Sequence, residues 1–202
     1  VGSEMCIRDS DMEYDEFKTY HQKMYIPRKK LSSNKDYQQI DSNIPDDIDT
    51  LVMSCGVGIQ FACVLKGLKK FNKKVLVDPK GNNFSKYKGA DIITPNFSEF
   101  IGEVGAVKNE REITLKAQSL MKSLNLGALL VTRGHQVMTL FKKEKSKIIR
   151  SNFPTQAKEV FDVSGAGDTV IASIAAALST GFDISSAVKL ANVAAGIVVG
   201  KS

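Results

Sequence analysis

The fold of this chain is constrained most by short apolar runs that alternate with longer segments of helical period. From residue 50 onward, the runs TLVMSC, KVLVD, ADIIT and ALLVT occupy residues 50–55, 74–78, 90–94 and 128–132. Runs of this length are typical of strands that are buried on both faces. Because helical segments separate them, we expect an α/β fold: a mostly parallel sheet with helices on both faces.

Two local patterns add detail to this expectation. Residues 109–125 predict a helix, because five apolar residues fall on one helical face and Asn109 with Glu112 forms a plausible N-terminal cap. Those five residues are Ile113, Ala117, Leu120, Met121 and Leu124. The runs VMTLF and KIIR flank a charged turn and predict a hairpin.

Three regions differ in pattern along the chain. Residues 1–10, VGSEMCIRDS, have no period and resemble translated adapter sequence, so we expect the native protein to begin further upstream. Residues 11–48 are polar and irregular and form a lead-in, whereas residues 49–202 carry the regular pattern. The fold argument therefore rests on residues 49–202.

Composition argues against several classes of function. The net charge is +6, but the lysine clusters lack interleaved aromatic residues and Trp is absent, which favours a solvated surface over a nucleic-acid partner. No apolar run is long enough to cross a bilayer, so we expect no membrane partner. Three cysteines without a CxxC pair predict neither disulfides nor zinc, and they fit a cytoplasmic location.

Three glycine-containing segments are candidates for binding phosphate. CGVGIQFA, residues 55–62, half-matches a dinucleotide-binding fingerprint, but Phe61 stands where a third glycine is needed. AGIVVGKS, residues 195–202, ends like a P-loop, but Ala195 replaces the first glycine and the interior is Ile-Val-Val. Such β-branched residues belong to packed structure rather than to a phosphate cradle, so we reject this segment.

The third segment, DVSGAGDT at residues 162–169, is the strongest candidate. It predicts a helix that begins near Gly165–Gly167 and ends at Gly181. Small residues at this start would let an anion reach the free amides of the first turn. Asp168 lies beside that position and could accept a proton from an attacking hydroxyl. A simple helix-capping role for Asp168 remains open at this point.

These residues resemble the ribokinase-like (PfkB) carbohydrate kinases over roughly residues 28–202. The runs VLVDPKGNNFSKYKGADIITPNFSEF, PTQAKEVFDVSGAGDTVIA and LANVAAGIVVGK look most like the heptose-7-phosphate kinase branch of ADP-heptose and lipopolysaccharide biosynthesis. The resemblance implies an ATP-dependent phosphotransferase. Its reaction would move the γ-phosphoryl of ATP to the C1 hydroxyl of D-glycero-β-D-manno-heptose 7-phosphate.

The resemblance also implies residue roles. Asp168 would be the general base, and the anion hole would be Gly165, Ala166 and Gly167. The ATP site would comprise Asn96, Phe97, Ser98, Glu99, Thr132, Gly134 and Asn192, with Glu99 holding Mg²⁺ through water. Taken alone, TPNFSE would also fit a proline turn that caps a helix. The implied partners are a phosphorylated sugar, a second copy in a homodimer, and an adenylyltransferase domain that is not present in this chain.

Departures from the family pattern leave alternatives open. Cys55 and Gly58 stand where an acid and a lysine are expected, and Val137 replaces a glycine of the nucleotide motif. Because the amino-terminal sugar-binding part is missing, we expect the chain to be an incomplete enzyme. The alternatives are another ribokinase-like sugar kinase, a non-catalytic nucleotide-binding fragment and, remotely, a dinucleotide-binding oxidoreductase.

Overall fold

The computed structural model describes residues 50–55, 74–134, 137–155 and 165–200, with the backbone alone at 50–55. Residues 48–202 form one compact unit. The predictions for residues 1–10 and 11–48, and for the glycines that follow Cys55, lie outside the described residues.

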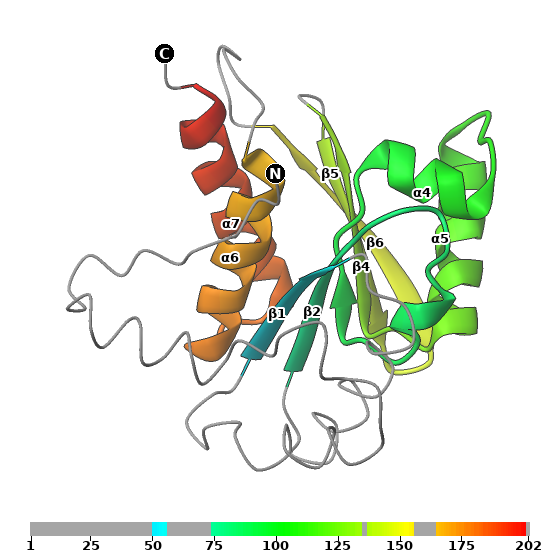
Figure 1. Ribbon diagram of the computed structural model, residues 1–202, viewed down its shortest axis with the longest axis horizontal. Coiled ribbons are helices and arrows are strands. Elements are labelled where there is room, and N and C mark those ends of the chain that lie inside the picture. The colour runs from blue at the N-terminus through cyan, green and yellow to red at the C-terminus, as the bar shows by residue number, and fades with distance from the viewer. Residues whose placement is uncertain (1–49, 56–73, 135–136, 156–164, 201–202) are drawn as a thin grey trace, which may run out of the picture. The chain divides into compact units, whose positions relative to one another are not determined.

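A six-stranded sheet forms the centre of this unit, in the order β1-β2-β3-β4-β5-β6 (Figure 1). Its first four strands are parallel neighbours, and β5 and β6 complete the sheet as an antiparallel hairpin. The predicted α/β class and the predicted hairpin are confirmed. The strands are β1 (Thr50–Cys55), β2 (Lys74–Pro79), β3 (Ile92–Ile93), β4 (Ala128–Arg133), β5 (Val137–Glu144) and β6 (Lys147–Pro154).

The run at residues 90–94 forms a shorter strand than its length predicts. Only Ile92–Ile93 form β3, although the amides of Asp91 and Thr94 still donate to the carbonyls of Val75 and Val77 in β2. Pro95 has no N–H and cannot extend the ladder. The strand therefore ends where the chain turns toward the next helix.

Helices cover both faces of the sheet, as predicted. Figure 1 shows α6 and α7 on one face and α4 and α5 on the other. The helices are α4 (Phe97–Val104), α5 (Glu110–Leu124), α6 (Ala166–Ser179) and α7 (Ile184–Val199), and a short 3-10 helix covers Ser85–Tyr87. In the described part of the chain, no helix is long and apolar enough to cross a membrane.

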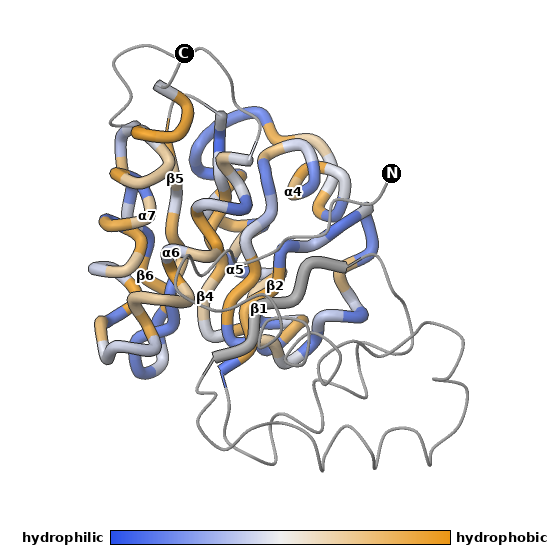
Figure 2. The backbone as a smooth tube through the Cα atoms, turned by 60° about the vertical axis from the view of Figure 1, so that its left-hand side comes forward, coloured by the Kyte–Doolittle hydropathy of each residue, from blue (hydrophilic) through white to orange (hydrophobic). Residues whose placement is uncertain are grey.

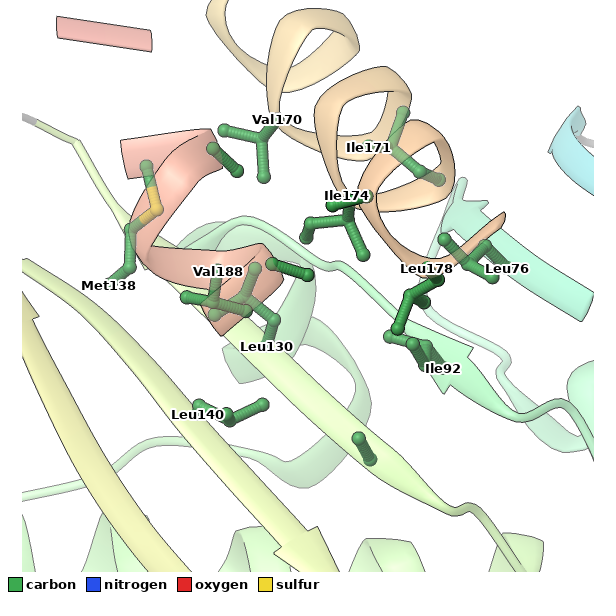
Figure 3. Close-up of a cluster of buried hydrophobic side chains, with 14 of the residues drawn as sticks. Leu76, Ile92, Leu130, Met138, Leu140, Val170, Ile171, Ile174, Leu178 and Val188 are labelled. Carbon is green, nitrogen blue, oxygen red and sulfur yellow. The ribbon is translucent and has the colours of Figure 1, made fainter. Parts of the chain in front are cut away.

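Alternation along β4 supplies side chains to both layers of the core. Ala128 and Leu130 belong to the cluster under α6 and α7, whereas the fully buried Leu129 and Val131 lie outside that cluster, as the two-residue period of a strand requires. Figure 3 shows Ile171, Ile174 and Leu178 of α6 in this cluster. The chain is apolar over long stretches of α6 and α7 (Figure 2).

The predicted pattern of α5 is also confirmed. All five residues of its predicted apolar face are buried, and the Asn109 side chain accepts from the amide of Glu112.

The end of α6 is also as predicted. Gly181 has φ +89°, and the amides of Gly181 and Phe182 donate to the carbonyls of Leu178 and Ala177. This closure turns the chain directly into α7.

Candidate functional site

The register of the sheet brings two predicted motifs together at the carboxyl ends of β3 and β4. Asn96, after β3, forms an isolated parallel bridge with Thr132 of β4. The amide of Thr132 donates to the carbonyl of Pro95 at 3.1 Å. Gly134 then adopts φ +58°, a left-handed conformation that glycine takes without strain. The TPN and TRG segments therefore form one edge, where ligands of open α/β sheets bind.

Asn96 caps α4 in a reciprocal arrangement. Its Oδ1 accepts from the amide of Glu99, and Glu99 Oε2 accepts from the amide of Asn96, both at 2.9 Å. TPNFSE therefore does cap a helix, as one of its two interpretations predicted. The cap uses only Oε2 of Glu99, and Oε1 takes no part in it.

The start of α6 has no such side-chain cap. Its N-cap is Gly165 at φ +75°, and the first intrahelical bond runs from the amide of Thr169 to the carbonyl of Gly165 at 2.9 Å. Among the described residues, the amides of Ala166, Gly167 and Asp168 have no acceptor. A Cβ placed on Gly165 or Gly167 would meet no described residue within 4 Å, so among these residues there is open space beside the helix start.

A pocket of about 330 Å³ joins this helix start to the carboxyl edge of the sheet. Its walls hold six of the residues that the sequence predicted, although these residues come from four separate segments. They are Asn96, Thr132, Gly134, Ala166, Gly167 and Asn192. The volume lies at the lower end of the usual range for small-molecule sites.

Other predicted residues lie beside the pocket rather than on its wall. Asp168 is exposed in the first turn of α6, next to Gly167, and makes no hydrogen bond or ion pair with the described residues. Phe97 lies under the guanidinium of Arg133, 5.0 Å from the ring centroid. Ser98 and Glu99 follow on the first turn of α4.

Asn192 lines the pocket and carries a buried amide. The residue is only 4% exposed, and its Nδ2 donates to the carbonyl of Pro154 at 2.7 Å. Because that carbonyl can only accept, the contact fixes which end of the amide faces Pro154. The other end, Oδ1, is buried and has no partner in the described part of the chain. A buried acceptor without a partner is costly, and a ligand donor would satisfy it.

Comparison with known proteins identifies the family. The model of the pfkB family carbohydrate kinases matches residues 13–202. This chain belongs to the pfkB family. It is 52% identical over 138 residues to the bifunctional protein HldE of Pseudomonas aeruginosa (strain LESB58), covering 68% of this chain and 28% of that protein. The HldE of Hahella chejuensis is 56% identical over 127 residues, covering 63% and 26%.

Solved structures share the fold of this pfkB family chain. Arabidopsis thaliana ribokinase complexed with ribose and ATP superposes with a TM-score of 0.66 at 23% identity, covering 83% of this chain and 53% of that one. Ribokinase from Thermotoga maritima gives 0.62 at 25% identity, covering 82% and 53%. The chain thus spans about half of the ribokinases and about a quarter to a third of the HldE proteins it matches. The ribokinase-like fold and the family resemblance are confirmed.

Sequence reasoning missed half of the pocket wall. The missed residues are Met138, Thr155, Val170, Ala195, Gly196 and Val199. Three of them belong to the rejected P-loop-like segment, whose residues 195–199 are helical in α7. The rejection was correct, but small residues at this helical spacing also offer a flat wall for a ligand. That signal was present in the sequence.

A charged cluster next to the pocket was also missed. Lys80 Nζ lies 2.8 Å from Asp78 Oδ2 and 3.7 Å from Glu99 Oε1. Partial burial lowers the pKa of Lys80, but the hydrogen bond to Asp78 and the charges of Asp78, Glu99 and Asp168 outweigh burial and raise it above its ordinary value. The run DPKG at the end of a strand was the available signal.

Proposed function

We propose that this chain forms the nucleotide side of an ATP-dependent sugar kinase whose acceptor is the C1 hydroxyl of D-glycero-β-D-manno-heptose 7-phosphate. One observation carries the proposal: a pocket with a buried free acceptor leads to the uncapped start of α6, where Asp168 stands beside open backbone amides. This arrangement suits a nucleotide whose adenine lies in the pocket and whose phosphates reach the start of α6, with the reacting sugar hydroxyl at Asp168.

The adenine base would bind at the α7 end of the pocket. Met138, Val170 and Val199 offer apolar walls for a flat ring. The Oδ1 of Asn192 would accept from the exocyclic amine of adenine and so gain the partner that it lacks among the described residues. Apolar walls with one well-placed polar group are typical of cofactor and nucleotide sites.

The phosphates would then reach the start of α6. The amides of Ala166, Gly167 and Asp168 are available, and the helix dipole adds favourable charge for an anion there. These donors would stabilise the charge that develops on the transferring group, without rearrangement of the protein.

Asp168 would act as general base. Its carboxylate would take the proton of the sugar hydroxyl as the hydroxyl oxygen attacks the γ-phosphorus and the bond to the bridging oxygen breaks, releasing ADP. Its exposure and lack of described hydrogen-bond partners keep the carboxylate free for this proton.

Mg²⁺ fits the residues at this end only as an ion shared with the nucleotide. Within the described residues, no group of three potential metal ligands occurs. Glu99 keeps Oε1 free of the helix cap, and it would hold the ion through water while phosphate oxygens supply most of the ligands, as is usual for Mg²⁺. When bound, the ion neutralises phosphate charge.

The heptose substrate rests on the sequence resemblance and on the HldE relatives. The DPKG, YKGA and TPNFSE runs match the heptose branch, and about half of the aligned residues are identical in the HldE proteins. The relatives are named bifunctional proteins, which fits a second activity beside the kinase, and the adenylyltransferase partner remains a prediction from the resemblance. The homodimer and the cytoplasmic location remain predictions.

The proposal is tested first by binding. We expect Mg-ATP, and not NAD, to raise the melting temperature of the purified chain and to bind in calorimetry. An ADP-release assay with heptose 7-phosphate, ribose and fructose 6-phosphate then tests the acceptor. Binding of NAD alone would contradict the kinase assignment. ATP binding with turnover of another sugar would contradict the heptose substrate. ATP binding without turnover is the result expected of an incomplete enzyme, and it would support the nucleotide side of the proposal alone.

A further inference from the structure

Lys80 is held at its backbone, whereas its side chain is partly exposed. It follows β2 directly, and its amide donates to the hydroxyl of Tyr87 at 3.1 Å. Tyr87 is fully buried, so the backbone position of Lys80 is tied to the core. The Lys80 side chain is nevertheless 52% exposed, so its ammonium can move without disturbing the strand.

The ammonium lies among carboxylates of the candidate active site. Asp78 Oδ2 is within hydrogen-bonding distance at 2.8 Å, whereas Glu99 Oε1 at 3.7 Å is not. The charge of Asp168 also acts on Lys80. An ammonium has three donors, and only one is engaged at hydrogen-bond length with the described side chains, which leaves donors for a further oxygen.

The position of Lys80 and its carboxylates relative to the pocket indicates which part of a bound nucleotide would lie near them. Asn96 and Gly167 line the pocket, Glu99 is the third residue of the helix that Asn96 caps, and Asp168 follows Gly167. Lys80, whose Nζ lies 3.7 Å from Glu99 Oε1, is therefore next to the end of the pocket where α4 begins. A nucleotide with its base at Asn192 would direct its terminal phosphate toward this end.

The charges at this end require a cation if a polyphosphate is to bind. The carboxylates of Asp78 and Glu99 lie within 4 Å of the single positive charge of Lys80, and the charge of Asp168 also acts on it. A polyphosphate brought next to these carboxylates would be repelled by them, the more so in a partly buried site. A mobile ammonium that can exchange a carboxylate for a phosphate oxygen offsets this repulsion.

We propose that Lys80 is a catalytic residue that binds the γ-phosphoryl group of ATP through its Nζ, giving up part of its contact with Asp78 and Glu99. The proposal rests on the proposed function, because it needs ATP in the pocket. Lys80 keeps its proton throughout and forms no covalent bond. Its charge stabilises the oxygens of the group in transfer, as cations do in other phosphoryl transfers.

The test compares two nucleotides that differ only in the γ-phosphate. Calorimetry with Mg²⁺ measures the affinities of the wild-type chain and of Lys80→Met for ATP and for ADP. We expect Lys80→Met to weaken ATP binding roughly 10- to 100-fold, the usual range for a charge-assisted hydrogen bond, and to leave ADP binding nearly unchanged. Lys80→Arg should keep part of the preference for ATP, because it keeps the charge.

Controls separate this role from a structural one. Lys88→Met removes an exposed lysine from the same connection and should change neither affinity. Melting temperatures show whether each variant folds, and Lys80→Gln, which can still bond to Asp78, replaces Lys80→Met if that variant does not fold. Equal losses for ATP and ADP, or no loss, would overturn the role of Lys80 alone. A wild-type chain that binds neither nucleotide would overturn the proposed function, and the Lys80 role with it.

Discussion

The helices α5 and α6 begin in opposite ways. At α5, Asn109 accepts from the amide of Glu112 at 3.0 Å, and Glu112 accepts from the amide of Lys108 at 2.8 Å. At α6, Gly165 supplies no side chain, and the amides that follow have no acceptor among the described residues. Side-chain caps stabilise a helix, so the absence of a cap at α6 gives up stability where a ligand can use the same donors.

The carboxylates in the two first turns differ in the same way. Glu110 of α5 is bound by both Arg133 and Arg150. Asp168 of α6 is exposed and makes no ion pair with the described residues. One acid is fixed in a surface network, and the other is left free to react. The contrast supports a structural role for α5 and a chemical role for the start of α6.

The largest expected effect comes from Asp168→Asn. The substitution keeps the size of the side chain but removes the base, so turnover should fall about 10²–10⁴-fold in a form of the protein that turns over. ATP affinity should stay the same, because the backbone amides are unchanged. Steady-state kinetics and calorimetry measure the two quantities. Near-normal turnover would show that Asp168 is only a first-turn residue like Glu110.

The sequence predicts those parts of the candidate site that lie within one short motif better than those that the fold brings together from separate segments. The helix start at residues 165–167 could be read from glycine spacing, since both the conformation and the open space depend on missing side chains. Thr132 and Asn96 could be placed at the carboxyl ends of two strands, but their contact arises from the register of β3 and β4, which no local pattern predicts. The DPKG run contains both Lys80 and Asp78, but the approach of Lys80 to Glu99 joins two segments and depends on how β2 and α4 are placed.

The second prediction is that Gly167→Val weakens ATP binding strongly while the helix still forms. A Cβ at Gly167 meets no described residue within 4 Å, so among these residues the valine has room until a ligand approaches. It would then occupy the space in front of the amides, and we expect a loss of roughly 10- to 100-fold, comparable to a lost charged hydrogen bond. Calorimetry measures the affinity, and circular dichroism checks the fold. Unchanged ATP affinity would contradict the prediction that the start of α6 is the anion hole.

The third prediction concerns the cap of α5. Asn109→Ala removes the acceptor for the amide of Glu112 and should lower the free energy of unfolding by about 1 kcal/mol. Nucleotide affinity should not change, because α5 does not line the pocket. Urea unfolding with and without ATP measures both effects. A change in ATP affinity as large as that of Gly167→Val would contradict the division of roles between the two helix starts.

The smallest expected effect is the pH dependence that Glu110 gives to stability. Burial raises the pKa of Glu110, but the hydrogen bonds and charges of Arg133 and Arg150 outweigh it and hold the pKa below its ordinary value of 4.5. A group whose pKa is lower in the folded state stabilises the protein above its unfolded pKa, and this contribution is lost as the pH falls through the folded value.

Since the Glu110 side chain is about half exposed (53%), solvent screens its ion pairs with Arg133 and Arg150. We therefore expect Glu110→Gln to lower the free energy of unfolding by less than about 1 kcal/mol at pH 7. The difference from the wild type should shrink as the pH falls below 4.5. Urea unfolding across this range measures it, with Glu144→Gln, which removes an exposed pair with Lys142, as the matched control. A difference that stays constant or grows in acid would show that the arginines do not stabilise the charged form of Glu110.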